Sequence, residues 1–282
     1  MIKLCAFSDE AAKELDGQIA ALKRNGITLT ELRSVGDKNV AELTESEAEA
    51  IAETLSKNAI SVWSVGSPLG KVEVGVDMTE YLEKVEHVCK IAKIFGAKRI
   101  RMFSFFEAYE SREKVFDNLS KMCEVAAKYG LTLCHENEKE IYGDTVERVL
   151  EVLQKVPKLR SVYDPANFIQ VGESSEKSLD ALHAKADYFH IKDVIASTEE
   201  LVPPGHGDGN IPELIRRIED DKVLTIEPHL TLFDAYKSID KSEMKHKFNF
   251  NSADEAFDAA VNATKKILID CGYKEINGGF EK

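Results

Sequence analysis

The chain has 282 residues, of which 43% are hydrophobic and 31% are charged, and its formal net charge is −13. This composition is typical of a water-soluble globular protein with room for a large core. The negative net charge disfavours a nucleic-acid or anionic-membrane partner, because phosphates favour basic surfaces. The sequence contains no run of about 18 apolar residues, so we expect no transmembrane span.

The first residues, Met1 to Asp9, enter a strand-like run without a long apolar segment and cleavage site, so we expect no signal peptide. The five cysteines are scattered, odd in number and include no CxxC pair: Cys5, Cys89, Cys123, Cys134 and Cys271. Reduced thiols and a cytoplasmic location are the simplest interpretation of this pattern.

Strand-like and helix-like patterns alternate along the chain. The strand-like apolar runs begin near residues 3, 28, 60, 98, 131, 160, 187 and 222. Their intervals, roughly 25 to 38 residues, are near the length of one βα unit. Amphipathic segments with helical spacing lie between these runs, and the clearest of them cover residues 43–57, 79–95, 112–129 and 145–156.

Eight strands with intervening helices predict an α/β fold, a (β/α)8 TIM barrel in a single domain covering residues 1–282. An open doubly wound sheet is the alternative, which is disfavoured because neither GxGxxG nor a P-loop follows the first strand. Residues 229–251 break the rhythm, so we expect a long loop over the barrel mouth before a final helix from about Ser252 to Cys271. Residues 272–282 contain two adjacent glycines and are expected to form a loosely ordered tail.

Four short motifs in the second half of the chain each follow a strand-like run. They are HENE at 135–138, DPAN at 164–167, HIKD at 190–193 and EPH at 227–229. In a parallel barrel the strand ends meet at one face, which brings together Glu136, Asp164, His190 and Glu227. Three hard oxygen donors and one imidazole suit a divalent cation such as Mn²⁺, Mg²⁺, Co²⁺ or Zn²⁺. One acidic residue at a strand end is more often a helix N-cap or an ion-pair partner, but four successive strand ends are harder to explain in that way.

In this order, the motifs resemble those of the sugar phosphate isomerase/epimerase group, which has the xylose isomerase-like TIM barrel. The resemblance runs from Phe7-Ser8-Asp9 to the final helix. It implies that one divalent metal ion is bound by Glu136, Asp164, His190 and Glu227. It also implies a small-molecule carbohydrate substrate and allows a homo-oligomer, because related enzymes are often dimers or tetramers.

The same fold group includes three-zinc DNA repair enzymes of the endonuclease IV type. Those enzymes carry additional histidines near the ends of the third and fourth strands and three residues after the aspartate. The corresponding positions here are Ser67, Ser104 and Asn167. Together with the negative net charge, this difference favours a one-metal site over DNA repair.

The resemblance implies a metal-assisted isomerisation or epimerisation of a small sugar, keto-sugar or sugar phosphate through an enediolate. Glu136 and Glu227 are expected on opposite sides of the substrate, where one removes a proton and the other returns it. A metal-dependent dehydratase or lyase of a polyol-derived ketone is the first alternative. A phosphodiester hydrolase is disfavoured by the missing histidines, and a non-catalytic sugar-binding barrel is disfavoured by the intact ligand set.

Residues near the other strand ends are candidates for substrate binding. Glu31 and Arg33 are two apart and point to the same side of a strand, where they either pair with each other or bind a polar substrate. Arg101 lies in an apolar strand and is costly to bury unpaired, so we expect it to reach a carboxylate or the substrate. Ser67 and Lys71 follow the third strand, and Lys71 is either a contact for an anionic group or a solvated surface residue.

The second half of the chain adds four substrate-binding candidates: Asn167, Lys192, His206 and His229. Lys192 follows His190 by two residues and pairs with either the substrate or Asp193. His206 lies within residues 203–212, a segment whose glycines give backbone amides access to an anion. His135 precedes Glu136 and should face the surrounding helices.

Overall fold

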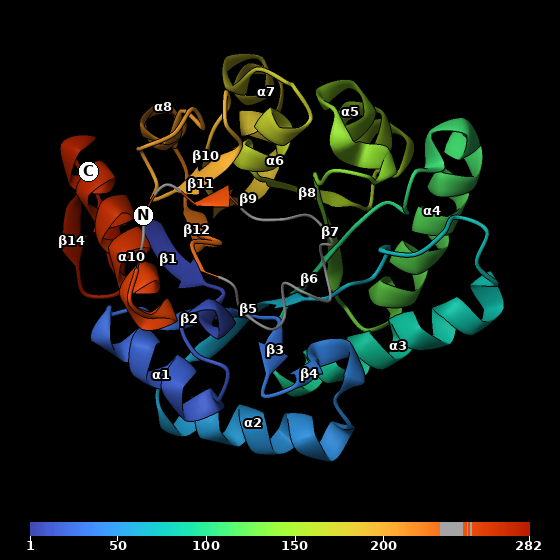
Figure 1. Ribbon diagram of the computed structural model, residues 1–282. Coiled ribbons are helices and arrows are strands. Elements are labelled where there is room, and N and C mark those ends of the chain that lie inside the picture. Colours follow the sequence, from blue (N-terminus) through green and yellow to red (C-terminus); the bar gives the residue numbers. More distant parts are fainter. Residues whose placement is uncertain (232–244, 247, 249) are drawn as a thin grey trace.

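The computed structural model describes residues 1–231, 245–246, 248 and 250–282. Over these residues the chain forms a barrel of eight parallel strands surrounded by helices (Figure 1). The barrel strands are β1 (Ile2–Ala6), β2 (Leu29–Leu32), β5 (Ser61–Gly66), β6 (Arg99–Met102), β7 (Thr132–Glu136), β8 (Arg160–Tyr163), β9 (Ala186–Ile191) and β12 (Lys222–Ile226). Each strand pairs with the next, and β12 pairs with β1 to close the ring. The predicted (β/α)8 TIM barrel is confirmed.

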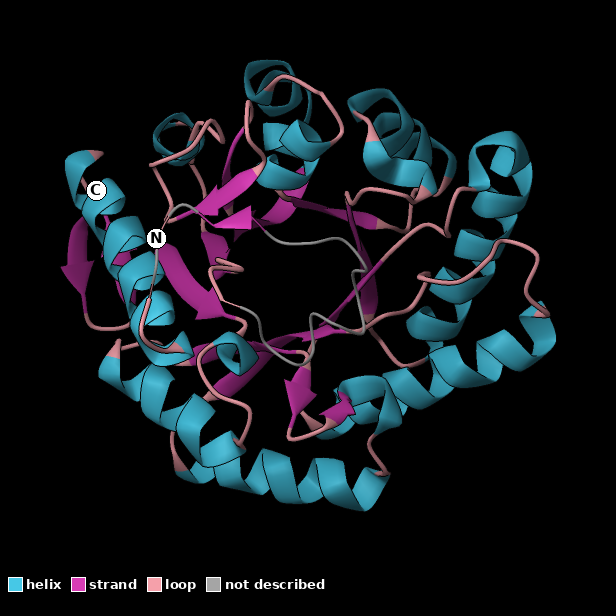
Figure 2. Ribbon diagram, viewed as in Figure 1, coloured by secondary structure: helices cyan, strands magenta, loops and turns pink. Residues whose placement is uncertain are grey.

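Helices cover the outside of the barrel (Figure 2). They are α1 (Leu15–Arg24), α2 (Glu45–Lys57), α3 (Met78–Ile94), α4 (Arg112–Lys128), α5 (Val146–Lys155), α6 (Pro165–Gln170), α7 (Ser175–Leu182), α8 (Ile211–Arg216) and α10 (Ala253–Asp270). Polar side chains cap several first turns: the hydroxyl of Thr44 accepts a hydrogen bond from the Glu47 amide at the start of α2. The helices α2, α3, α4, α5 and α10 agree with the five predicted segments to within two residues at each end.

The apolar core lies on both sides of the barrel wall. A large cluster fills the space between the strands and the helices. A smaller cluster fills the barrel interior: Cys5, Cys134, Val162, Tyr188 and Val223. Because alternate residues of a strand face the same side, Glu136 and His190 lie two positions beyond Cys134 and Tyr188 on the interior face. The interior is therefore apolar in its lower part and charged at the carboxyl ends of the strands.

Short strands add to the carboxyl-end loops of the barrel. A hairpin of β3 (Ser34–Val35) and β4 (Lys38–Asn39) follows β2, and a small sheet joins β10 (Asp193–Ile195), β11 (Glu200–Val202) and β13 (Lys245–His246). Most of the segment 229–251, where we expect a long loop over the mouth, lies outside the described residues, so that loop stays a prediction. Among the described helices, none has the length and apolar content to cross a membrane.

The structure differs from the loosely ordered tail expected at 272–282. These residues form an antiparallel hairpin of β14 (Lys274–Ile276) and β15 (Gly279–Glu281), and β15 pairs with β1. Phe280 is buried against the barrel. The two glycines serve the turn rather than flexibility: Gly278 has a φ of 92°, and a Cβ on Gly279 would lie 2.5 Å from the carbonyl oxygen of Ile2.

Candidate metal centre

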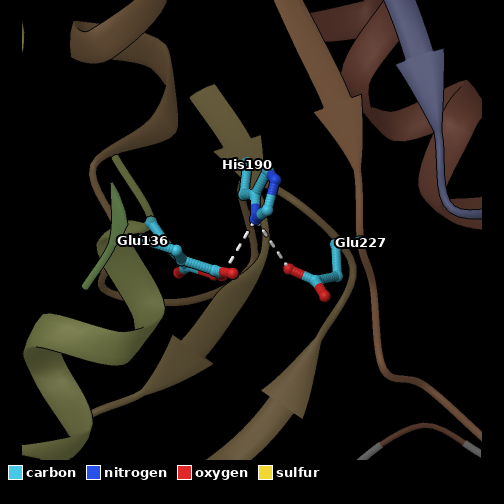
Figure 3. A group of neighbouring side chains, drawn as sticks. Glu136, His190 and Glu227 are labelled. Carbon is cyan, nitrogen blue, oxygen red and sulfur yellow. Dashed lines mark hydrogen bonds and ion pairs between the residues drawn. The ribbon is translucent and has the colours of Figure 1, made fainter. Parts of the chain in front are cut away.

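The four motif residues of the second half converge at the carboxyl end of the barrel. Each stands at the end of its own strand: Glu136 on β7, Asp164 after β8, His190 on β9 and Glu227 after β12. One ligand-type atom from each residue lies within 4.8 Å of the others, and all four side chains are buried. Figure 3 shows Glu136 and Glu227 reaching His190 from opposite sides.

His190 occupies the middle of this group. Its Nδ1 atom lies 2.9 Å from Oε1 of Glu136 and 3.0 Å from Oε2 of Glu227. Burial would lower the pKa of His190, but the carboxylates of Glu136, Glu31 and Glu227 outweigh burial and raise that pKa well above its usual range. The group therefore favours a positive charge at the point where the carboxylates meet.

Asp164 divides its two carboxylate oxygens between two tasks. Oδ1 caps helix α6 by accepting hydrogen bonds from the amides of Ala166 and Asn167, at 2.8 and 3.1 Å. Oδ2 accepts no hydrogen bond and lies 2.8 Å from Nζ of Lys192 as an ion pair. Burial raises the pKa of Asp164 to about 7, against the attraction of Lys192. The helix-cap and metal-ligand interpretations of this aspartate are compatible, because they use different oxygen atoms.

Two arginines hold the two glutamates in the same way. Nη1 of Arg33 lies 3.1 Å from Oε1 of Glu227, and Nε of Arg101 lies 3.1 Å from Oε2 of Glu136. Each glutamate therefore presents one oxygen to an arginine and its other oxygen to His190. This arrangement fixes the carboxylates on both sides of the histidine and compensates their charge inside the barrel.

The donor set fits a divalent cation. Oδ2 of Asp164 and Oε2 of Glu227 are buried and face positive partners, Lys192 at 2.8 Å and His190 at 3.0 Å, so both point to a place where positive charge is bound. Burial would raise the pKa of Glu227, but the charges of Lys192 and His190 outweigh burial and hold that pKa well below its usual range. Glu227 is therefore a carboxylate at neutral pH, as a metal ligand must be.

Asp9 and Glu10, which the sequence did not single out, surround Arg33 on its other side. Asp9 accepts two hydrogen bonds from the guanidinium, at 2.8 and 3.0 Å, and Glu10 accepts one at 3.3 Å. Burial raises the pKa of Glu10 to about 8, against the attraction of Arg33. The available signal was their position directly after β1, where the other barrel strands also end in functional groups.

A pocket of about 450 Å³, its open mouth included, adjoins the centre. Its lining contains five of the predicted substrate-binding residues: Arg33, Arg101, Asn167, Lys192 and His229. It also contains both glutamates that the sequence predicts as catalytic, Phe103 from the aromatic run after β6, and three residues that the sequence missed: Glu138, Gln170 and Leu201. Most of this lining is polar or charged, which suits a substrate that carries several hydroxyl groups.

The structure does not place Glu31 or Ser67 in the pocket lining. Glu31 is fully buried and accepts hydrogen bonds from Tyr188, Thr225 and His190 rather than from Arg33. Glu31 points to the same side of the strand as Arg33, as the spacing predicts, but it lies deeper in the barrel, where Tyr188 and His190 bind it. The Ser67 hydroxyl donates to the carbonyl oxygen of Arg101 at 2.7 Å and is used within the barrel wall.

Lys71 and His206 also lie outside the residues that line the pocket. Nζ of Lys71 is 3.2 Å from Oε2 of Glu138 and 4.4 Å from the centroid of the Phe103 ring. Lys71 therefore contacts two residues of the pocket lining without being part of that lining. His206 is exposed and its ring lies 5.5 Å from that of Phe248. A solvent-facing position therefore describes His206 better than the predicted pocket position.

The anion bound by the glycine amides of residues 203–212 belongs to the protein. The amides of Gly205, Gly207 and Gly209 all donate to the Asp193 carboxylate, at 2.8, 3.0 and 2.8 Å. Asp193 thus does not pair with Lys192, whose Nζ lies near Asp164 and 4.0 Å from Oε2 of Glu227. The glycine amides of the loop after β9 therefore bind Asp193, which lies at the start of the same loop. Our expectation of a site for an external anion was wrong.

Second-layer contacts fix the remaining motif residues. The Asn137 side chain donates to the carbonyl oxygen of Asp164 and accepts from its amide, both at 2.9 Å, so it joins the ends of β7 and β8. Asn167 donates to the carbonyl oxygen of Asn137 at 2.8 Å and lies 3.4 Å from Oε1 of Glu136. His135 is buried away from the centre, where its ring bonds to Ser104 at 2.9 Å, and burial lowers its pKa to about 3.

The arrangement of strands and strand-end residues matches a known family. Residues 19–263 match the family described as Xylose isomerase-like TIM barrel, which is most of the chain. The chain belongs to this family. The resemblance stated from the sequence motifs is thereby confirmed.

Individual relatives are more distant. A protein of Mycoplasma pneumoniae described as a probable L-ribulose-5-phosphate 3-epimerase, UlaE, is 23% identical over 140 residues, which are 47% of this chain and 46% of that protein. The match thus spans about half the length of this curated relative.

Solved structures agree over nearly the whole chain. The probable 3-DHS dehydratase AsbF of Bacillus anthracis has a TM-score of 0.71 at 18% identity, covering 94% of this chain and 99% of that one. The IOLI protein with a bound zinc atom has a TM-score of 0.70 at 19% identity, covering 95% and 97%. At these identities the likeness establishes the fold.

Proposed function

We propose that this protein is a divalent-metal-dependent isomerase or epimerase of a small sugar, keto-sugar or sugar phosphate. The observation that carries the proposal is the placement of Glu136 and Glu227 on opposite sides of His190, each with one oxygen held by an arginine. The epimerase description of the Mycoplasma pneumoniae relative supports the reaction class.

The ligand set of the proposal is Glu136, Asp164, His190 and Glu227. When bound there, one divalent ion (Mn²⁺, Mg²⁺, Co²⁺ or Zn²⁺) would polarise a substrate carbonyl and acidify the neighbouring C–H, which favours an enediolate. The zinc atom bound in the structure of the similar IOLI protein supports a metal in this protein. The asymmetric use of Asp164, one oxygen to helix α6 and one to the centre, supports a ligand that binds through a single oxygen.

Glu136 and Glu227 are the proposed catalytic pair. Glu227 is held ionised, so it can accept a proton, while Glu136 can return one from the other side of the substrate. A carboxylate with a low pKa is a weak base, and the acidified C–H must offset this mismatch. Because arginines from β6 and the end of β2 fix both carboxylates, neither has to move to change roles.

Lys192, Asn167 and His229 are the proposed contacts for substrate hydroxyl groups. All three line the pocket beside the glutamates. Burial lowers the pKa of His229 to about 4, so its imidazole is neutral at physiological pH and can either donate or accept a hydrogen bond. A cytoplasmic location, a homo-oligomer and the identity of the native metal stay predictions of the sequence.

Isotope exchange tests the reaction class directly. The metal-loaded protein would be incubated with a panel of ketoses and ketose phosphates in deuterated water, and the products followed by NMR and mass spectrometry. We expect an isomer of the substrate that carries deuterium at the carbon next to the carbonyl. A product lighter by one water would replace the proposal with the dehydratase alternative, and no reaction across the panel would count against both.

Replacing Glu227 by Gln tests the assigned roles. We expect bound metal to be weakened but detectable, and turnover to fall by about 10³-fold or more because the base is lost. Glu138→Gln is the matched control, since it makes the same change in the pocket lining outside the four ligands. Turnover in the Glu227 variant equal to that of the control would remove this residue from the mechanism.

A further inference from the structure

Glu31 is a buried carboxylate to which the proposed mechanism gives no task. It stands at the end of β2 with no exposed surface. An ion of this kind costs several kcal/mol to bury unless hydrogen bonds compensate it. The protein supplies three donors: Tyr188 Oη at 2.7 Å, Thr225 Oγ1 at 3.0 Å and His190 Nε2 at 3.1 Å. Because three hydrogen bonds compensate the buried carboxylate of Glu31, we expect its negative charge to have a specific role.

The three donors come from strands that do not pair with β2. Tyr188 and His190 are on β9 and Thr225 is on β12, so Glu31 reaches across the interior beneath the metal centre. Two of the donors are neutral hydroxyls, which can turn to suit whichever acceptor is present. The imidazole is different, because only one of its nitrogens faces Glu31 while the other faces Glu136 and Glu227.

We infer that Glu31 is a positioning residue for the metal ligand His190. By accepting the proton of Nε2 it fixes the ring orientation and the tautomer in which Nδ1 carries the lone pair. That lone pair then points to the place where Glu136 and Glu227 converge. Ligating histidines commonly donate their second N–H to a carboxylate, which also raises the basicity of the ligating nitrogen. The inference rests on the proposed metal site and adds a residue that does not touch metal or substrate.

The first test measures metal affinity in Glu31→Gln and in the wild-type protein by competition with a chromophoric chelator, using Zn²⁺ and Co²⁺. We expect the dissociation constant to rise by about 10- to 100-fold, the range typical for loss of an outer partner of a ligating histidine. Thr225→Val is the matched control, because it removes one hydrogen bond from Glu31 and leaves the contact with His190 intact. We expect this control to shift affinity by less than about threefold.

The second test detects the tautomer, which a merely structural role would not change. Long-range ¹H–¹⁵N correlation of the zinc-loaded protein reports which ring nitrogen of His190 carries the proton. We expect the proton on Nε2 in the wild-type protein and in Thr225→Val, and a mixture of ligation states in Glu31→Gln. Should Glu31→Gln not fold, Glu31→Asp keeps the charge but shortens the reach, and it should also weaken metal binding.

The outcomes separate this inference from the proposed function. If wild-type protein binds neither metal, the metal site itself is wrong and the proposed function fails with it. If wild-type protein binds metal and the folded Glu31 variant binds it equally well with the same tautomer, only the positioning role is overturned.

Discussion

The two halves of the barrel contribute different chemistry to one centre. The last four strands, β7 to β12, carry the proposed ligands, each at a strand end. The first four, β1 to β6, carry or immediately precede the groups that hold those ligands: Asp9 and Glu10 around Arg33, Arg101 on Glu136, and Glu31 on His190. One half would therefore bind the cation, and the other would fix the geometry in which it is bound.

Removing a ligand from the late half should have the largest effect. We expect the wild-type protein to carry about one equivalent of divalent metal after purification, and Asp164→Ala and Glu227→Ala to carry none. This effect is larger than the about 10- to 100-fold weakening of metal affinity expected when an outer residue is replaced. Elemental analysis of the purified proteins measures this. Stoichiometric metal in both alanine variants would erase the distinction between the halves.

Removing an arginine of the early half that pairs with a proposed ligand should mainly lower the stability of the fold. Arg33→Met leaves buried carboxylates uncompensated, so we expect the free energy of unfolding to fall by about 3–5 kcal/mol. Added divalent cation should restore part of that loss, because the ion supplies positive charge at the same carboxylates. Chemical denaturation with and without metal measures both effects.

Arg99→Met provides the comparison for that experiment. Arg99 pairs with Asp187 at a partly exposed position near the start of β6, away from the centre. We expect a smaller loss of stability and no recovery with cation. Equal recovery in both variants would show that the metal acts on the whole barrel rather than on the arginine-held carboxylates.

The pH dependence of metal binding gives a smaller and graded effect. Burial raises the pKa of Asp164 to about 7, and neighbouring carboxylates raise that of His190 above its usual range. Protons on these groups compete with the cation, so affinity should increase as pH rises through about 7, approaching tenfold per pH unit for each proton released below the pKa. Calorimetry at several pH values measures the slope, and affinity independent of pH would contradict the assignment of these two ligands.

The late half was accessible from the sequence because its residues stand in short motifs at regular strand ends. Glu136, Asp164, His190 and Glu227 needed only the barrel hypothesis to be brought together. The sequence also indicated that a buried Arg101 reaches either a carboxylate or the substrate, and in the structure it pairs with Glu136.

The early half was not accessible in the same way. Glu31 was expected in the pocket beside Arg33, but three partners more than 150 residues away along the chain bind it deeper in the barrel. One expectation for the late half also failed: the glycine amides after β9 were expected to bind an external anion, and they donate to Asp193 instead. Both outcomes depend on which of several polar partners is nearest in space, and spacing along the chain does not determine that.

The seam of the barrel has a consequence for how the protein is made. β1 pairs with β12, so residues 2–6 lie beside residues 222–226, and the hairpin at 274–281 pairs with Ile2 at the other edge of β1. During synthesis this edge of β1 therefore stays without its final neighbour until residues 222–226 have left the ribosome. Long-range pairing of this kind slows folding and exposes strand edges in the meantime. The acidic surface would help to keep nascent chains apart during that interval.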